Sequence, residues 1–217
     1  MDVGLIQPDP LNCDLRRTAR AYARLHDDFP SRVAEEARKL SDWGADLLIA
    51  DIPYLSIAAA ARAGIDSIAI ASLSWDRVIS AYFDLKQKAA GRWYADSLSA
   101  YAETSLALLP EPALAGDCFR HKRPIPPIAV AGNHLPELRT RLGIAPDDQR
   151  SLVVCSLGGI SAARLPLKPM QQDQRFHWLV NINPVPLGDH IHRLSVVGDL
   201  RYRDIIASCD GLVSKPG

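Results

Sequence analysis

Two short apolar runs, separated by a helix-forming segment, set the pattern around which the chain is built. The first run, Leu47 to Ala50, is stopped by Asp51, and the second runs from Ile68 to Ala71. Between them the alanine-rich segment from Leu55 to Ala63 closes on Gly64. Continuous apolar runs of this length are typical of strands buried on both faces of a parallel sheet. Alanine favours helix and a following glycine often ends one, so the pattern predicts a βαβ unit with parallel strands.

The same reasoning predicts further elements on both sides of this unit. Apolar residues at spacings of three and four predict helices over 15–43 (with a break near Phe29), 78–85, 93–103, 135–142 and 202–209. Asp14 stands where an N-cap of the first helix belongs. Short apolar runs predict strands at 2–7, 105–109, 151–156, 176–182, 191–197 and 211–214. The chain is therefore expected to be α/β, with mostly parallel sheets.

A change in composition predicts the domain boundary. Residues 117–127 combine a basic cluster with Pro124, Pro126 and Pro127, as a linker does. We therefore expect a first domain over 1–116, a linker over 117–127 and a second domain over 128–217. The basic cluster could contact a phosphate, but a solvated loop is the commoner use of such a run, and we favour it.

Composition excludes several classes of function. The 217 residues carry 25 basic and 25 acidic side chains, so the net charge is zero. This balance argues against a nucleic-acid partner and against a polybasic membrane patch. No apolar run approaches the ~20 residues of a membrane span, and the start lacks the pattern of a signal peptide. The four cysteines form no CxxC pair, so we expect reduced thiols in a cytoplasmic protein without a transmembrane segment.

Candidate chemistry lies where the first two predicted strands end, because ligands of parallel sheets meet the loops at the carboxyl ends of strands. Asp51 could hold a sugar hydroxyl or act as a base, or it could cap the next helix. Ser74 and Asp76 offer a hydroxyl and a carboxylate, and either could instead be an N-cap. Trp75 could form a wall for a sugar or pack in the core.

The second half offers weaker signals. Gly158 and Gly159 follow a predicted strand, where adjacent glycines allow close approach of a phosphate, although an ordinary tight turn explains the local pattern better. No histidine pair has the spacing of a helical metal motif. Strand alternation would place His190 and His192 on one face, but we expect no metal site there.

Three stretches of the chain carry a family resemblance. They are residues 4–11, then 51–53 with 58–65 and Ser74-Trp75-Asp76, and finally 208–217, which end in Ser-Lys-Pro-Gly. These stretches resemble the GT-B-type glycosyltransferase-like family, in particular bacterial glycosyltransferase-like proteins and the N-terminal region of plant L-arabinokinases. More distantly the chain is similar to the transferase that adds N-acetylglucosamine to the lipid-linked peptidoglycan precursor. The resemblance spans nearly the whole chain.

This resemblance implies two Rossmann-like domains that face a cleft and transfer a sugar from a nucleotide-diphosphate donor without a metal or other cofactor. The diphosphate would lie against Gly158, Gly159 and the turn Lys215, Pro216, Gly217. The unknown acceptor would lie against Pro53, Ser72, Ser74, Trp75 and Asp76, with Asp51 as the candidate catalytic residue. The family's first strand would precede Met1 and its donor-side continuation would follow Gly217, so both domains are expected to be incomplete.

We therefore expect a glycosyltransferase-like protein, as a fragment or a shortened member. Two alternatives stay open. One is a non-catalytic protein that binds a sugar or a partner, with exposed sheet edges that favour a homodimer. The other is a nucleotide-sugar hydrolase or epimerase of the same fold.

Overall fold

The computed structural model describes residues 3–9, 11–114, 116–157, 167–181 and 188–214. The chain forms two compact units, Met1–Ile6 with Asp14–Ile128 and Ala129–Gly217 with Gln7–Cys13. Each unit is an α/β domain with a four-stranded parallel sheet flanked by helices, so the expected Rossmann-like fold class is confirmed.

The sheet of the first unit has its strands in chain order. Strands β1 (Leu47–Ala50), β2 (Asp66–Ile70), β3 (Leu106–Pro110) and β4 (Lys122–Ile125) are all parallel. Helix α3 (Tyr54–Ala63) connects the first two, which confirms the predicted βαβ unit. Gly64 ends α3 in the left-handed conformation with φ of 71°, as a C-cap glycine does.

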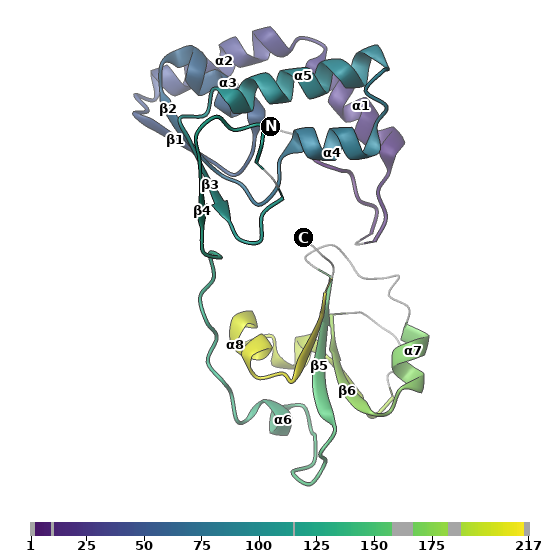
Figure 1. Cartoon of the computed structure of the whole chain (residues 1–217). Coiled ribbons are helices and arrows are strands. Elements are labelled where there is room, and N and C mark those ends of the chain that lie inside the picture. The colour runs from purple at the N-terminus through teal and green to yellow at the C-terminus, as the bar shows by residue number, and fades with distance from the viewer. Residues whose placement is uncertain (1–2, 10, 115, 158–166, 182–187, 215–217) are drawn as a thin grey trace. The chain divides into compact units, whose positions relative to one another are not determined.

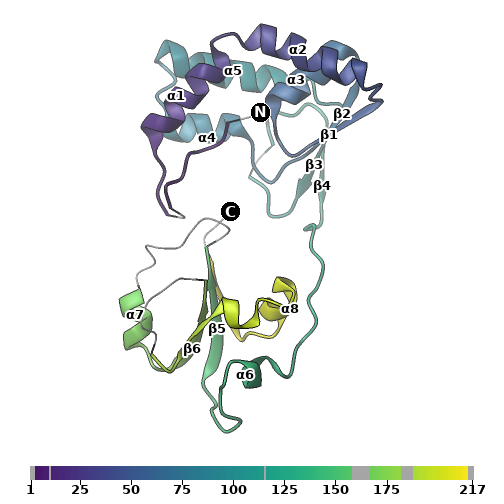
Figure 2. The same ribbon diagram turned by 180° about the vertical axis from the view of Figure 1, so that it is seen from behind.

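Helices pack on one face of this sheet. Helices α1 (Leu15–His26), α2 (Phe29–Asp42), α4 (Trp75–Tyr82) and α5 (Lys88–Ala102) complete the unit. Asp14 caps α1 by accepting a hydrogen bond from the Arg17 amide at 2.9 Å, and Pro30 lies in the first turn of α2, so the predicted cap and break are confirmed. In both views α2, α3 and α5 lie on the same side of β1–β4 (Figures 1 and 2).

The opposite face of the sheet is much less covered at its β1 edge. Ala50, Ala69 and Ala107 point to the helical side and are at most 4% exposed. On β1, Leu47 is 45% exposed and Ile49 is 65% exposed. The strand that the apolar run predicted as buried on both faces is therefore buried on one face only among the described residues, because no described element packs against its other side.

The predicted linker is wrong for much of its length. Lys122–Ile125 form strand β4, which pairs in parallel with β3, and Phe119 is buried in the core of the first unit. The proline-rich composition misled because Pro124 lies on an edge strand, where a missing amide costs no ladder hydrogen bond. The first unit accordingly extends to Ile128.

The strand expected at 2–7 is absent from the described residues 3–7. The Ile6 amide donates to Thr18 Oγ1 at 3.0 Å and the Ile6 carbonyl accepts from the Asp14 amide at 2.8 Å. These bonds tie the segment to the start of α1, and Gly4 lies directly against the Trp75 ring. The backbone groups that a strand would use are thus partly occupied.

The second unit has the strand order β7-β6-β5-β8, again all parallel. Its strands are β5 (Ser151–Ser156), β6 (Phe176–Val180), β7 (Ile191–Arg193) and β8 (Gly211–Ser214), and its helices are α6 (Leu138–Arg141), α7 (Leu167–Gln172) and α8 (Tyr202–Ala207). The strand expected over 191–197 is too long, because Leu194–Val197 turn into the 3₁₀ helix η1. Helices cover both faces of this sheet (Figure 1).

No helix in the described part of the chain combines the length and the apolar character needed to cross a membrane.

Candidate functional site

The carboxyl ends of β1 and β2 place two polar loops at one edge of the first sheet. Ala50 pairs with Ala69 in the parallel register, so the loop from Asp51 to Pro53 and the loop from Ser72 to Ser74 leave the sheet side by side. The chain after β3 joins them, because the Leu114 amide donates to the Ser72 carbonyl at 2.8 Å. This edge is where parallel sheets bind ligands.

Ile52 has a backbone conformation that is unusual for its residue type. Its φ is +53°, in the left-handed region that a β-branched residue rarely adopts. Such a conformation costs of order 1–3 kcal/mol and persists only where the surroundings hold it. Here the Ile52 carbonyl accepts a hydrogen bond of 2.8 Å from the Tyr101 hydroxyl, and the Ile52 side chain is buried in the core.

The hydroxyl of Tyr101 bonds both loops. Besides donating to Ile52, it accepts a hydrogen bond from the Trp75 amide at 3.2 Å. Trp75 is the first residue of α4, so this bond satisfies one of the amides that every helix leaves open at its start. Tyr101 lies on α5 and is fully buried, and its ring packs against Phe119.

Asp51 is exposed and makes no hydrogen bond or ion pair with a described residue. The alternative that it caps the next helix is wrong, because Pro53 holds the N-cap position of α3. Asp51 is therefore presented to solvent at the carboxyl edge of the sheet, and its catalytic role stays a prediction.

Ser74 and Asp76 are the buried polar residues of the second loop. They are 1% and 4% exposed. Ser74 holds the N-cap position of α4, yet its side chain makes no capping bond. Neither Ser74 Oγ nor Asp76 Oδ1 has a hydrogen-bond partner among the described residues. An unsatisfied buried polar atom costs about 1–3 kcal/mol, so two adjacent ones need an explanation.

The thiol of Cys118 lies beside this pair. Burial raises the pKa of Cys118 to about 11, while the polar contact with Ser74 lowers it and the charge and contact of Asp76 raise it further. These contacts with the thiol do not meet hydrogen-bond geometry at Ser74 Oγ or Asp76 Oδ1. The thiol is therefore protonated at neutral pH and is a weak hydrogen-bond donor, not a nucleophile. Together the three side chains form a small polar cluster inside an apolar region, which we call the Ser74 cluster (Ser74, Asp76 and Cys118).

The remaining predicted residues of this edge have different surroundings. Ser72 is exposed, and Pro53 is partly buried at the start of α3. Trp75 is partly buried and packs against the core of the first unit and against Gly4, so packing accounts for this side chain at least in part. The structure thus brings Ser74 and Asp76 together, and leaves Asp51 and Ser72 on the surface.

A second set of buried hydrogen bonds fixes the residue that follows the first loop. His26 contacts Asp96 through Nδ1 at 2.9 Å and the Tyr54 hydroxyl through Nε2 at 2.8 Å. Burial lowers the pKa of His26, although Asp96 partly opposes the shift. These hydrogen bonds join α1, α3 and α5 and fix Tyr54, the first residue of α3.

Sequence reasoning missed Tyr101, Cys118 and His26. Each reaches its polar partner across more than 25 positions of the chain, as with the 49 that separate Tyr101 from Ile52. No local spacing signals such contacts, because they depend on how helices pack over the sheet.

In the second unit, the residues predicted to hold a diphosphate lie outside the described residues. Gly158, Gly159, Lys215, Pro216 and Gly217 belong to this set. The strands that lead to them are described, and Ser156 of β5 pairs with Ser214 of β8 in the parallel register. Two motifs far apart in the sequence therefore continue from neighbouring strand ends at one edge of the sheet.

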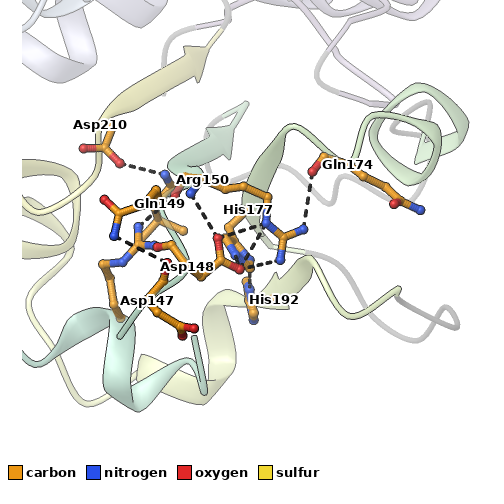
Figure 3. A network of polar contacts seen from close by, with 10 residues as sticks. Asp147, Asp148, Gln149, Arg150, Gln174, His177, His192 and Asp210 are labelled. Atoms are coloured by element: carbon orange, nitrogen blue, oxygen red, sulfur yellow. Dashed lines mark hydrogen bonds and ion pairs between the residues drawn. The ribbon is translucent and has the colours of Figure 1, made fainter. Parts of the chain in front are cut away.

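A network of polar contacts in the second unit lies at the opposite ends of the strands, where β5 and β6 begin (Figure 3). Asp148 accepts hydrogen bonds from the Arg150 guanidinium and from His177 Nε2, the latter at 3.0 Å. His177 Nδ1 in turn lies 2.9 Å from His192 Nε2. An ionised Asp148 accepts a hydrogen bond from His177 Nε2–H, so in the neutral form of His177 we assign His192 Nε2–H as the donor to His177 Nδ1.

Charges explain the protonation states of this network. Hydrogen bonds from Arg150 hold the pKa of Asp148 well below its usual range. Burial, with repulsion from His177 as the next cause, lowers the pKa of His192 to about 4. Asp148 and His177 lie where β5 and β6 begin, away from the edge that binds ligands in parallel sheets, so the network supports the fold.

Strand alternation is expected to place His190 and His192 on one face, and in the structure their side chains have different partners. His190 Nε2 contacts the Met170 carbonyl at 2.9 Å, whereas His192 contacts His177. Within the described ranges no group of three or more His, Cys, Asp or Glu side chains could hold a metal ion.

Comparisons of the chain with models of protein families, with curated proteins and with solved structures each found no match. The geometry of the sites therefore carries the functional argument.

Acid should destabilise the second unit through His192. Its folded-state pKa of about 4 lies below the ordinary histidine pKa of 6.5, so the unfolded chain binds more protons between these values. The stability contribution is present above pH 6.5 and is lost as pH falls towards 4, by about 1–3 kcal/mol. The measurement is the protection factor of the Leu179 and Val180 amides against hydrogen exchange across this range.

The variant His192→Gln keeps an N–H donor for His177 but does not titrate in this range, so it should flatten the pH profile. His134→Gln, which removes an exposed histidine outside the network, should leave the profile as in the wild type. An unchanged profile in His192→Gln would contradict the assigned role.

Proposed function

We propose that this chain is a glycosyltransferase-like protein whose first unit binds a hydroxyl-rich acceptor and whose second unit binds a nucleotide-diphosphate sugar. The observation that carries the proposal is the pair of buried oxygens, Ser74 Oγ and Asp76 Oδ1, without partners among the described residues. They lie after β2, at the ligand-binding edge of a parallel sheet.

The chemistry of this pair suits a sugar. A carboxylate accepts hydrogen bonds from hydroxyl groups, and a serine hydroxyl both donates and accepts, as a sugar hydroxyl does. Asp76 lies in the first turn of α4. A hydroxyl that reached this cluster would relieve the cost of two unsatisfied oxygens, which favours binding.

The donor side is supported by topology. Neighbouring parallel strands β5 and β8 lead to Gly158-Gly159 and to Lys215-Pro216-Gly217. Backbone amides next to glycines and a lysine ammonium are groups that bind diphosphate, and stabilising a leaving diphosphate is what sugar transfer requires. In this proposal, Asp51 is the candidate catalytic residue because its carboxylate is exposed at the carboxyl edge of the first sheet.

Donor binding is tested with UDP-glucose, UDP-N-acetylglucosamine and GDP-mannose, each titrated calorimetrically into the full chain. We expect at least one to bind, and the double substitution Gly158→Val/Gly159→Val to weaken that donor tenfold or more by removing close backbone approach. Product analysis distinguishes transfer to an added sugar from hydrolysis and epimerisation. Binding that the double substitution leaves untouched would refute the assignment of the donor site.

Acceptor binding is tested on Asp76. Its replacement by asparagine keeps the shape but removes the charge, so affinity for the monosaccharide that binds best in a panel of glucose, galactose, mannose and arabinose should fall about tenfold or more. The readout is the ligand-detected NMR titration. Asp84→Asn, which changes an exposed carboxylate in the connection from α4 to α5, is the matched control and should bind as the wild type does. Equal losses in both variants would contradict a specific role for Asp76.

A second candidate function, partner binding through a sheet edge, is favoured by the surface of β1. This edge strand exposes Leu47 and Ile49, and Trp43 before it is 75% exposed. The other edge strand, β4, carries Lys122, Arg123 and Pro124, which discourage pairing. An uncharged edge with free main-chain groups is suited to antiparallel pairing with β1 of a second copy.

Light scattering after size-exclusion chromatography tests this second candidate. We expect a dimer at tens of micromolar protein, and Ile49→Lys should shift it to the monomer because a lysine on an edge strand discourages edge-to-edge pairing. Leu212→Lys changes an exposed apolar residue of the other unit and should not affect association. A wild-type chain that stays monomeric would refute this candidate.

A further inference from the structure

The two loops at the carboxyl edge of the first sheet are joined by one hydroxyl group, and we propose that Tyr101 is a positioning residue that holds both loops in their ligand-binding arrangement. The proposal deepens the acceptor site described above and rests on that proposed function where it speaks of a ligand. The juxtaposition itself is a feature of the fold: one phenol bonds a strained carbonyl and a helix-start amide.

Ile52 is held in a backbone conformation that its side chain disfavours. A residue branched at Cβ does not settle at φ of +53° by its own preference, so something must hold it there. The Tyr101 O–H donates to the Ile52 carbonyl at 2.8 Å, a good geometry for a hydroxyl donor. Without this bond the Ile52–Pro53 peptide would lose the hydrogen bond that fixes its orientation, and the loop that carries Asp51 would be less constrained.

Tyr101 also bonds the start of α4. Ser74 holds the N-cap position but does not cap with its side chain. Tyr101 satisfies the Trp75 amide instead, at 3.2 Å. One amide of the helix start thus has a partner that is not Ser74, and Ser74 Oγ stays free of described partners within the buried Ser74 cluster. A polar group that is buried and left unused at a ligand edge is placed for a ligand rather than for the helix.

The Tyr101 side chain is itself held firmly by packing. Tyr101 is fully buried on the long helix α5 and packs against the rings of Tyr54 and Phe119. Tyr54 begins the helix after the first loop, and Phe119 follows Cys118 of the Ser74 cluster. Tyr101 therefore contacts the first loop at Ile52, the helix start at Trp75 and the residue after Cys118, and a well-packed side chain can hold them to a fixed geometry.

The test is a double-mutant cycle of Tyr101→Phe with Ile52→Gly, read by hydrogen exchange without any ligand. Tyr101→Phe should speed exchange of the Trp75 amide about tenfold or more, because that amide loses its acceptor. The Ser56 and Ile57 amides, which bond the Pro53 carbonyl at 3.1 and 3.2 Å, should also exchange faster as the strained loop relaxes.

Ile52→Gly separates the two effects. Glycine adopts positive φ without strain, so in this background Tyr101→Phe should no longer speed exchange at Ser56 and Ile57. The effect on the Trp75 amide should persist, because it does not depend on Ile52. Tyr94→Phe, on the same helix at the margin of the core, is the control and should leave all three amides unchanged.

The proposal is overturned if Tyr101→Phe leaves the Ser56 and Ile57 amides protected from exchange. It is also overturned if the substitution speeds their exchange equally in the wild-type and Ile52→Gly backgrounds. A ligand titration then tests the proposed acceptor site separately from the role of Tyr101. If the wild type binds a monosaccharide, Tyr101→Phe should weaken it about tenfold at a temperature where the variant is fully folded. If the wild type binds none, the acceptor site fails while the exchange result still decides the role of Tyr101.

Discussion

Parallel pairing of the strands is the constraint on which the rest of the structure depends. When β1 and β2 run in the same direction, the chain must leave the sheet at one edge and return at the other, so each connection needs a crossover such as α3. The same rule brings the loops that follow the strands to a common edge. Asp51, Ser74 and the chain after β3 are neighbours for this reason, although the sequence separates them widely.

The crossover helices explain the chemistry of that edge. Because α5 packs on the sheet, the Tyr101 hydroxyl can bond both loops, and the aromatic rings of the core hold the side chain in place. The loops are therefore supported by a rigid element, whereas Ser74 Oγ and Asp76 Oδ1 are left without described partners. Here the Tyr101 hydroxyl bonds the backbone of both loops, while two side-chain oxygens have no described hydrogen-bond partner. This arrangement is suited to binding a ligand.

The polar groups of the two units lie at opposite ends of the strands and differ in how well their hydrogen bonds are satisfied. In the second unit the amino ends of β5 and β6 carry a dense, mutually satisfied network of Asp148, Arg150, His177 and His192. Its members bond one another, so it stabilises the fold and titrates with acid. In the first unit two buried oxygens near the carboxyl ends of the strands, Ser74 Oγ and Asp76 Oδ1, have no hydrogen-bond partner among the described residues. Satisfaction of hydrogen bonds distinguishes a supporting network from a candidate site more clearly than residue type does.

The sequence by itself determined the fold class, most strand positions and the βαβ unit, because these depend on local apolar runs, on Gly64 and on caps such as Asp14. It also indicated the Ser74 to Asp76 loop, since strand ends are visible in the pattern. Only the tertiary structure decided that Lys122–Ile125 form a strand, because pairing with β3 outweighs a proline-rich composition at an edge. Only packing placed Tyr101 beside Ile52 and Cys118 beside Ser74, since contacts across dozens of residues arise from the way α5 and the β3–β4 connection pack around the sheet, not from spacing along the chain.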